Sequence, residues 1–458
     1  MADNIILSEK VKVSTDSRQT QLNNNICVIG CTGSGKSKSI IEPDMLNAFE
    51  RSFIVYDPKR ELYDQYSPLL ESRGTKVYEL NLTDPKQSDV AFDPLYYVAS
   101  DEDISVLASA IVNLTPQREN SSADRYWDDA SAVLAKFGLY YVIATENNAN
   151  FADFLDFIIK KINIEDGYGL IKTSVDSHLE EIKKKHPEHP MIEPFDSLKV
   201  LPIKTAGCVF STLRTTLTAV FNPGLKEMFR NRKSFDIKKF ASERSVLFIT
   251  ANGANNYLNS FVNMIFDICI NEISKIADTY PRKRLPIPVH LIMDDFACGS
   301  VIKAFPEYIS KFRSKGISST IVLQSESQLK AMYGEYGCKT IMNNCDTIVY
   351  LGGSDLETAK NISERLNAPL EKVLYLPLGD IIVFRRGSYP IIDRRYPIFE
   401  DKEYKKAVLL AKRKRNNLAH VSTDSSSRVV EETAVYELDD SLQADLERKF
   451  DELFGPVE

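Results

Sequence analysis

A glycine-rich segment near the N-terminus carries the residue types that hold a phosphate chain. The pattern Gly-x-x-x-x-Gly-Lys-Ser/Thr is matched by Gly30, Cys31, Thr32, Gly33, Ser34, Gly35, Lys36 and Ser37. Glycines let backbone N–H groups turn inward, Lys36 can bridge the β- and γ-phosphates, and the Ser37 hydroxyl can ligate Mg²⁺. An apolar run at 26–29 precedes the segment and an amphipathic stretch at 37–49 follows it. This context favours a triphosphate-binding P-loop over a chance glycine-rich turn.

Two carboxylates follow another apolar run, at 289–293. A P-loop enzyme needs an acid on a neighbouring strand to hold the magnesium shell. We therefore expect Asp294 to serve Mg²⁺ and Asp295 to polarise the attacking water, at the strand end where α/β proteins bind ligands. The alternative is that both acids cap a following helix. Asp57, after the run at 53–56, is a rival acid, and an Asp-Pro turn explains it equally well.

Two further side chains are weaker candidates. Phosphoryl transfer uses a positive finger and an amide that senses water or phosphate, and Arg313 and Gln324 have the required chemistry. Alone, an arginine of this kind is most often solvated, and a glutamine at a strand end often caps a turn. The chain lacks the Asn-Lys-x-Asp motif that reads guanine, which favours ATP as the nucleotide.

Short apolar runs and helical patterns alternate around these residues, as expected for a parallel sheet with crossover helices. Strands are predicted at 26–29, 53–56, 76–80, 245–250, 289–293, 319–323, 347–351 and 380–384. Helical periodicity dominates from 101 to 208, most clearly at 126–144, 151–161 and 171–185. The predicted fold class is therefore α/β, with a P-loop NTPase domain at 25–100 and 209–400 and an all-α insertion domain at 101–208.

The remaining segments and the composition narrow the function classes. Residues 1–24 form a short extension, and 401–458 a basic and then acidic flexible tail with an amphipathic patch at 442–453. A net charge of −7 excludes a strongly basic chain, so any nucleic acid must be bound by a local surface or channel. Seven cysteines without Cys-x-x-Cys spacing favour reduced thiols over zinc. No apolar stretch reaches about 18 residues, so no transmembrane segment is predicted.

In order along the chain, a series of segments resembles the motifs of the type IV coupling proteins of conjugation and type IV secretion, TraG/TraD-like relatives of FtsK and HerA. The similarity runs from 25 to 398. Besides the P-loop, it rests on 54–62 (IVYDPKREL, like Asp-Pro-Lys-Gly-Glu-Leu), 91–95 (AFDPL, like Asn-Pro-Leu), 294–297 (DDFA, like Asp-Glu-Phe-Ala), 313–317 (RSKGI, like Arg-x-x-Gly-Ile) and 324–329 (QSESQL, like Gln-Ser-x-x-Gln-Leu).

The resemblance implies a RecA-like motor domain interrupted by an all-α domain, using ATP and Mg²⁺ with DNA-stimulated hydrolysis. It implies a ring, expected to be a homo-hexamer, with nucleotide between subunits. Arg313 would then be an arginine finger for a neighbour's ATP, and Gln324 a γ-phosphate sensor. The implied partners are single-stranded DNA with its relaxase, or a secreted protein, and membrane-embedded type IV secretion components. A cytoplasmic protein attached to the inner face of the membrane through partners is expected.

Three departures from the family pattern leave alternatives open. Asp295 stands where the family commonly has glutamate, and its carboxylate is shorter by about one C–C bond, which alters water activation. Arg60 replaces a glycine, so the turn after Asp57 is expected to differ. The family's N-terminal transmembrane helices are not seen in this sequence. A cytosolic HerA-like DNA translocase and a nucleotide-binding recruitment adaptor with little ATPase activity therefore remain as alternative functions.

Overall fold

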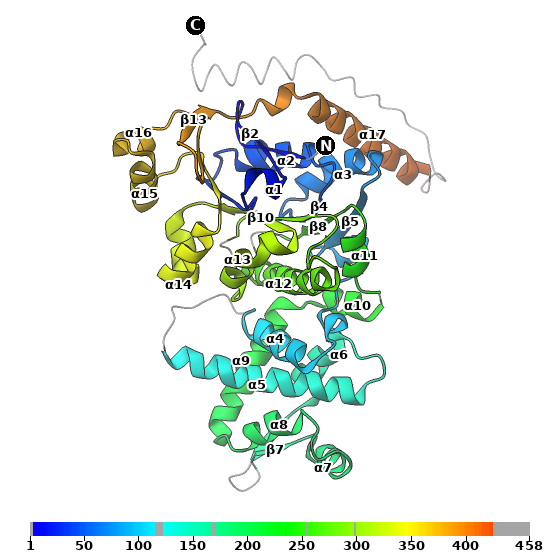
Figure 1. Ribbon diagram of the computed structural model, residues 1–458. Coiled ribbons are helices and arrows are strands. Elements are labelled where there is room, and N and C mark those ends of the chain that lie inside the picture. The colour runs from blue at the N-terminus through cyan, green and yellow to red at the C-terminus, as the bar shows by residue number, and fades with distance from the viewer. Residues whose placement is uncertain are drawn as a thin grey trace, which may run out of the picture. The chain divides into compact units, whose positions relative to one another are not determined.

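The computed structural model describes residues 3–114, 122–166, 171–231, 233–252, 255–296 and 299–424 (Figure 1). Residues 1–411 form one compact unit and 412–458 a second. The described part of the second unit, 412–424, is helical. The acidic end of the tail, including the predicted amphipathic patch at 442–453, lies outside the described residues. None of the described helices combines the length and apolar composition needed to cross a bilayer.

A nine-stranded sheet forms the centre of the first unit, in the order β13-β12-β11-β3-β10-β9-β4-β8-β5. The strands are β3 (Ile26–Ile29), β4 (Ser52–Tyr56), β5 (Lys76–Asn81), β8 (Ser245–Thr250), β9 (Val289–Met293), β10 (Ile317–Leu323), β11 (Thr347–Tyr350), β12 (Asp380–Arg385) and β13 (Ile391–Arg394). Every predicted strand is confirmed, and β13 was not predicted. Within this sheet, β11, β3, β10, β9, β4, β8 and β5 pair in parallel, whereas β12 and β13 continue it by antiparallel pairing.

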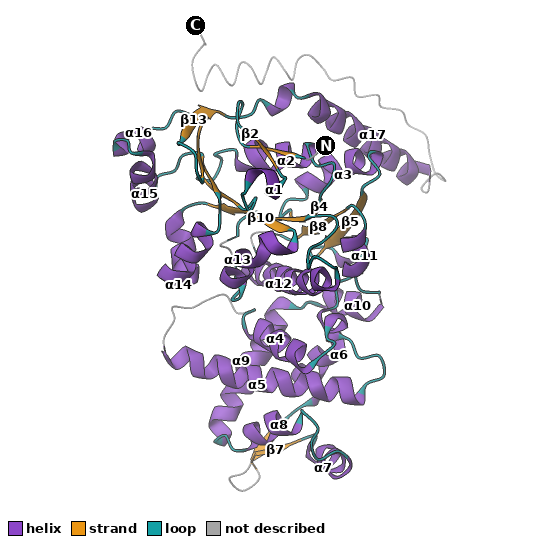
Figure 2. Ribbon diagram, in the orientation of Figure 1, coloured by secondary structure: helices purple, strands orange, loops and turns teal. Residues whose placement is uncertain are grey.

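The two faces of the sheet carry separate hydrophobic cores, because successive strand residues point to opposite faces. In β3, Ile26 and Val28 join one core, and Cys27 and Ile29 join the other. The covering helices (Figure 2) are α2 (Glu42–Leu46), α3 (Glu61–Ser72), α11 (Ile237–Ser242), α12 (Asn256–Thr279), α13 (Phe305–Lys315), α14 (Glu326–Asn343), α15 (Leu356–Leu366) and α16 (Leu370–Leu374). Burial of both faces explains why the parallel strands are nearly continuous apolar runs.

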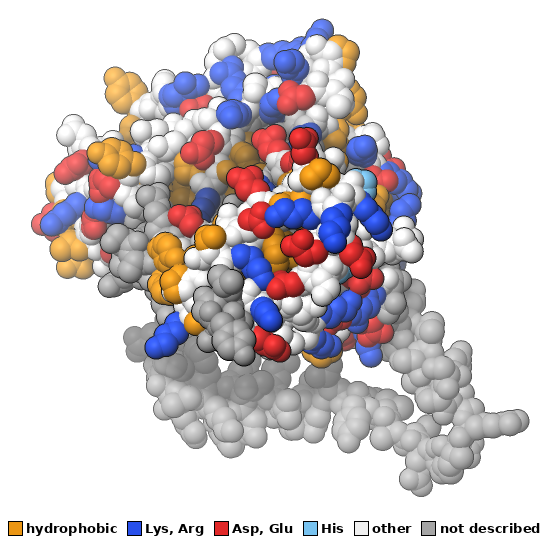
Figure 3. All heavy atoms as spheres, turned by 90° about the horizontal axis from the view of Figure 1, so that it is seen from below, with side chains coloured by type: hydrophobic (Ala, Val, Ile, Leu, Met, Phe, Trp, Pro, Cys, Tyr) orange, Lys and Arg blue, Asp and Glu red, His pale blue; other side chains and the backbone are white. Residues whose placement is uncertain are grey.

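The segment between β5 and β8 is mostly helical. It contains α4 (Asp101–Val112), α5 (Ser122–Thr145), α6 (Phe151–Asp156), α7 (Asp176–Lys185), α8 (Ile192–Lys199), α9 (Ile203–Val220) and α10 (Pro223–Asn231). The expectation of an all-α insertion needs correction, because β6 (Ile164–Asp166) and β7 (Ile171–Thr173) pair as an antiparallel hairpin. The helix predicted at 171–185 therefore begins only at Asp176. The face in Figure 3 shows basic and acidic side chains intermingled.

The predicted boundary between 208 and 209 also needs correction, because it cuts α9 in its middle. Helices α9 and α10 pack with α5 and α6, so the helical region extends to about Asn231 before the sheet resumes at β8. Its core is continuous with one face of the sheet, since Phe137, Phe154 and Val209 belong to the same buried cluster as Ile29. Sequence periodicity predicts the change from an α/β pattern to a mostly helical one, but it does not predict this shared core.

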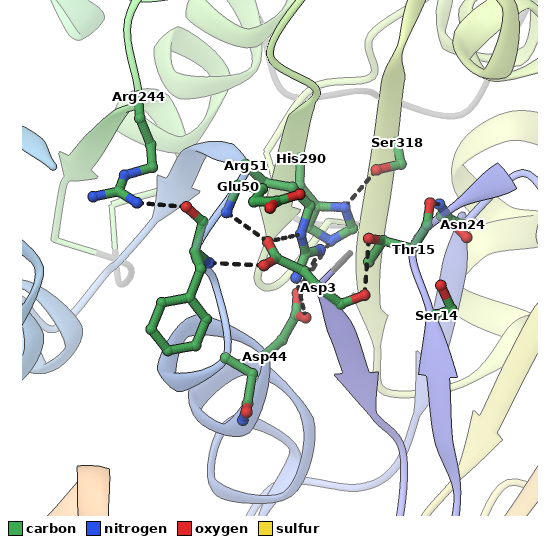
Figure 4. Close-up of polar contacts among 12 residues, drawn as sticks. Asp3, Ser14, Thr15, Asn24, Asp44, Glu50, Arg51, Arg244, His290 and Ser318 are labelled. Carbon is green, nitrogen blue, oxygen red and sulfur yellow. Dashed lines mark hydrogen bonds and ion pairs between the residues drawn. The ribbon is translucent and has the colours of Figure 1, made fainter. Parts of the chain in front are cut away.

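The N-terminal extension is part of the fold. β1 (Asn4–Ile6) and β2 (Lys12–Ser14) pair as a hairpin, followed by α1 (Ser17–Thr20), and their apolar side chains are buried in the core with Val28. Arg51 binds Asp3 (Nε–Oδ2 3.2 Å) and Asp44 (Nη2–Oδ1 2.8 Å) in a buried network (Figure 4). At the other end, residues predicted as the start of a flexible tail form helix α17 (Lys402–Asp424).

Candidate nucleotide-binding site

The P-loop begins where β3 ends and is held between two neighbouring strands. Gly30 N donates to Leu323 O (3.1 Å) and Cys31 N to Gly352 O (3.1 Å), so the last residue of β10 and a residue just after β11 fix its start. Gly33 (φ 78°) and Gly35 (φ 75°) adopt the left-handed conformation. Glycine adopts this conformation without the steric cost that a Cβ imposes, so the loop geometry explains the spacing of the motif.

The loop interior fits a phosphate chain. A Cβ on Gly30 would lie 2.5 Å from Ser34 Oγ, so only glycine fits there. Ser34 Oγ is buried and has no hydrogen-bond partner among the described residues. Lys36 Nζ donates to Gly30 O (2.6 Å) and Cys31 O (3.1 Å), which places the ammonium group over the loop. An inward-facing orphan hydroxyl and a lysine at one cradle are the donors that phosphate oxygens require.

Asp294 and Asp295 lie at the same edge of the sheet, directly after β9. Ser37 Oγ is 3.5 Å from Asp294 Oδ2. A hydroxyl and a carboxylate at this separation fit one octahedral Mg²⁺, whose metal–oxygen distances are about 2.1 Å and whose shell keeps several waters. Burial raises the pKa of Asp294 to about 6, and the neighbouring Asp295 adds to the shift. Asp295 has a left-handed backbone (φ 51°) and donates its N–H to Asp294 Oδ1.

Gln324 and Asp57 also follow strands at this edge, with different surroundings. Gln324 is exposed and directly follows Leu323, whose carbonyl holds Gly30. Asp57 is buried and accepts a hydrogen bond from Tyr63 N (2.8 Å) in the first turn of α3. Burial raises its pKa to about 7, with the backbone N–H groups of Tyr63 and Leu62 opposing the shift. Asp57 therefore has a structural role at the start of α3, as its Asp-Pro sequence suggested.

The structure does not bring Arg313 to this site. Arg313 lies near the end of α13, directly before β10 begins, and thus at the opposite edge of the sheet from the P-loop. It is exposed and donates to Ser17 O (3.3 Å) and Gln21 Oε1 (3.4 Å). Arg313 is therefore far from the P-loop of its own chain.

The arginine that does reach the loop is Arg395, which the motifs did not indicate. A Cβ on Gly35 would lie 3.1 Å from one of its Nη atoms. Arg395 follows β13, a strand whose short sequence, Ile391–Arg394, carries no nucleotide-binding pattern. Its only signal in the sequence is a pair of adjacent arginines that follows an apolar dipeptide and Asp393, which is too common to indicate a site.

Arg60 occupies a position where the resembling family has glycine, and its backbone conformation is one that glycine favours. Arg60 adopts the left-handed conformation (φ 62°) that a glycine would take without strain. Its guanidinium forms two hydrogen bonds with the buried carboxylate of Glu79 (2.6 and 2.9 Å). Arg60 therefore adopts at this turn a conformation that glycine takes readily, and its ion pair with Glu79 stabilises that conformation.

The motif series and this geometry agree with a comparison against known families. The model for the family described as type IV secretory system conjugative DNA transfer matches residues 3–368. The chain belongs to this family. No curated protein matches this conjugative DNA transfer protein significantly.

Solved structures show the same fold as this member of the conjugative DNA transfer family. The bacterial conjugative coupling protein TrwB in complex with ADP and Mg²⁺ matches with a TM-score of 0.63 and 16% identity, over 85% of this chain and 89% of that chain. The TrwB complex with a non-hydrolysable ATP analogue has a TM-score of 0.61 and 16% identity, over 82% and 86%. VirB4 of Thermoanaerobacter pseudethanolicus has a TM-score of 0.52 and 12% identity, over 86% and 96%.

Proposed function

We propose that this chain is an ATP-hydrolysing coupling protein that recruits single-stranded DNA with its relaxase, or a protein cargo, to a type IV secretion channel and powers the transfer. The observation that carries the proposal is one sheet edge that combines the P-loop, the Ser37–Asp294 pair and Gln324 in a member of the conjugative DNA transfer family. The TrwB structures in complex with an ATP analogue and with ADP and Mg²⁺ support ATP and Mg²⁺ as ligands of this chain.

Each residue has a distinct task in this proposal. The loop backbone and Lys36 bind the phosphates, and Ser37 and Asp294 hold Mg²⁺, which neutralises charge that develops on the phosphate oxygens. Asp295 accepts a hydrogen bond from the attacking water and orients it, and Gln324 senses the γ-phosphate. Arg313 enters the site of a neighbouring subunit in a ring, which we propose to be a homo-hexamer. Such a division between subunits couples turnover to assembly.

The test is ATP hydrolysis by the purified chain with and without single-stranded DNA. We expect DNA to stimulate turnover and Lys36→Ala to abolish it. Lys38→Ala is the matched control, because Lys38 Nζ pairs with Glu42 (2.9 Å) and not with the loop. Nucleotide binding without turnover under any DNA condition would favour the recruitment adaptor. Turnover stimulated by DNA, in a chain that binds neither relaxase nor secretion components, would favour the HerA-like translocase.

A further inference from the structure

The sheet topology carries Arg395 to the edge where the P-loop lies. β11 pairs with β3 in parallel, and β12 and then β13 follow by two antiparallel pairings. Two reversals restore the direction, so the carboxyl end of β13 lies at the same edge as that of β3. The Arg395 guanidinium is then close to the loop backbone at Gly35. A Cβ built on Gly35 would lie 3.1 Å from an Nη atom of Arg395 and 3.7 Å from Ser39 Oγ.

The backbone around Arg395 is held in place from both sides. Arg395 N donates to Gly379 O (2.9 Å), and Arg394 O accepts from Glu9 N (2.9 Å) in the turn between β1 and β2. The preceding Asp393 is buried and accepts from Ser8 Oγ (2.6 Å) and Lys10 N (2.9 Å) of the same turn. The N-terminal hairpin thus fixes the position from which the Arg395 side chain extends. A residue held in this way is suited to binding a ligand in one geometry.

Arg395 has no close ion-pair partner within the described residues. Its Nε is buried without a hydrogen-bond partner there, and the side chain forms no ion pair with any described residue. The nearby Asp380 instead pairs with Arg394 (3.1 Å). Burial lowers the pKa of Arg395, and Cys31 and Asp380 oppose the shift. A buried guanidinium N–H without a partner is costly, and the planar fork of an arginine matches phosphate oxygens.

We propose that Arg395 is a nucleotide-binding residue that acts in cis and contacts a phosphate common to ADP and ATP. This inference rests on the proposed function, because it assumes a nucleotide in the P-loop. The loop backbone at Gly35 cradles the α- and β-phosphates, whereas the motif lysine reaches the β- and γ-phosphates. Arg395 therefore differs from Arg313, which lies at the other edge and is proposed to serve the γ-phosphate of a neighbour.

The experiment measures the affinity of the full chain for fluorescent ADP and for a fluorescent non-hydrolysable ATP analogue, both with Mg²⁺. We expect Arg395→Ala to weaken both by about tenfold, the loss of roughly one charge-assisted hydrogen bond. Arg394→Ala is the matched control, because the adjacent Arg394 is exposed and pairs with Asp380, and its affinities should stay within about twofold of the original protein.

Each outcome decides one statement. Equal affinities for Arg395→Ala and Arg394→Ala would overturn the role of Arg395 and leave the P-loop assignment intact. A loss confined to the ATP analogue would overturn the assignment to a shared phosphate. If the original chain binds neither nucleotide, or Lys36→Ala binds as well as the original, the proposed function itself fails. If Arg395→Ala lowers the melting temperature without nucleotide, Arg395→Gln, which keeps most of the side-chain length, decides by the same criteria.

Discussion

Two groups of buried polar side chains, one at each edge of the central sheet, differ in how fully they are paired. At the amino edge, Arg51 lies before β4 and binds Asp3 and Asp44, and nearby His290 in β9 binds Ser318 and Thr320 (Nδ1–Oγ 2.7 Å, Nε2–Oγ1 2.8 Å; Figure 4). At the carboxyl edge, Ser34 Oγ and Arg395 Nε are buried without partners among the described residues.

In these two groups the paired side chains stabilise the fold, and the unpaired ones lie at the proposed ligand site. Unpaired atoms are not confined to the carboxyl edge, since Thr75 Oγ1 and Arg244 Nε, directly before β5 and β8, also lack partners among the described residues. Paired buried charges hold the N-terminal hairpin against the sheet, and the carboxylates of Asp44 and Asp3 raise the pKa of Arg51 against the opposing effect of burial. Unpaired polar groups at the carboxyl edge carry a desolvation cost that a ligand would remove. Parallel strands favour this arrangement, because the loops that follow their carboxyl ends meet in one crevice.

Arg313 gives the strongest test of the difference between the two edges, because it lies at the amino edge and is nevertheless proposed to take part in ATP hydrolysis. Arg313→Ala should lower kcat by about a thousandfold or more and leave nucleotide affinity unchanged, as for a finger acting in trans. Mixing Arg313→Ala with Lys36→Ala subunits should restore part of the ATPase activity, because some neighbouring pairs carry both intact residues. Lys311→Ala, an exposed residue of the same helix, is the control. Failure to complement, together with an active monomer, would contradict the assignment.

Arg51 tests the amino edge by stability. Arg51→Leu leaves two buried carboxylates unpaired and should lower the free energy of unfolding by about 3–5 kcal/mol, measured by urea titration.

Asp294→Asn is the contrasting variant at the carboxyl edge. Because burial raises the pKa of Asp294 to about 6, its neutral replacement should leave stability unchanged or higher at pH 8 while impairing ATP hydrolysis. Equal destabilisation by both variants would remove the distinction.

His290 tests the amino edge through the pH dependence of the free energy of unfolding. Burial lowers its pKa to about 4, an effect that Arg51 reinforces and Asp44 opposes. The folded chain therefore binds fewer protons at this site than the unfolded chain, whose histidine titrates near about 6.5. Its contribution to stability should fall as pH drops from 6.5 towards 4, with a slope of about 1.4 kcal/mol per pH unit.

The control for this measurement is His290→Asn, in which other groups such as Asp57 and Asp93 still titrate. The quantity to follow is the difference in unfolding free energy between the two proteins across that pH range. We expect the original protein to lose its advantage on acidification. A difference that does not change with pH would show that His290 is not a buried neutral group.

Arg60 has the smallest expected effect. Arg60→Gly relieves a left-handed backbone strain of about 1 kcal/mol but leaves the buried Glu79 carboxylate without its ion pair. We expect a net loss of about 1 kcal/mol in the free energy of unfolding. Adding Glu79→Gln should recover it, because the remaining amide carries no charge. If the double variant does not recover the stability lost in Arg60→Gly, the turn depends on contacts other than this ion pair.

The sequence alone was sufficient for the features that are local. Consecutive residues define each of these features: the strand before the P-loop, the glycine spacing, and the two acids after β9. Their meeting at one edge follows because parallel strands share a direction. Eight strands were predicted because each contains a short run rich in apolar residues, and most of them are buried on both faces, although β5 is buried only in its second half. The less regular β13, with its exposed isoleucines, lacks that signal.

Tertiary structure decided what depends on distant segments. Arg395 reaches the P-loop only because two antiparallel pairings bring β13 back to the direction of β3, and because the turn between β1 and β2 holds its backbone. Arg313 is separated from its own P-loop by the length of the strand that follows it. Neither relation leaves a periodic pattern in the sequence, since it arises from pairing between segments hundreds of residues apart. A motif therefore identifies the phosphate-binding loop, while the fold determines which arginines face it.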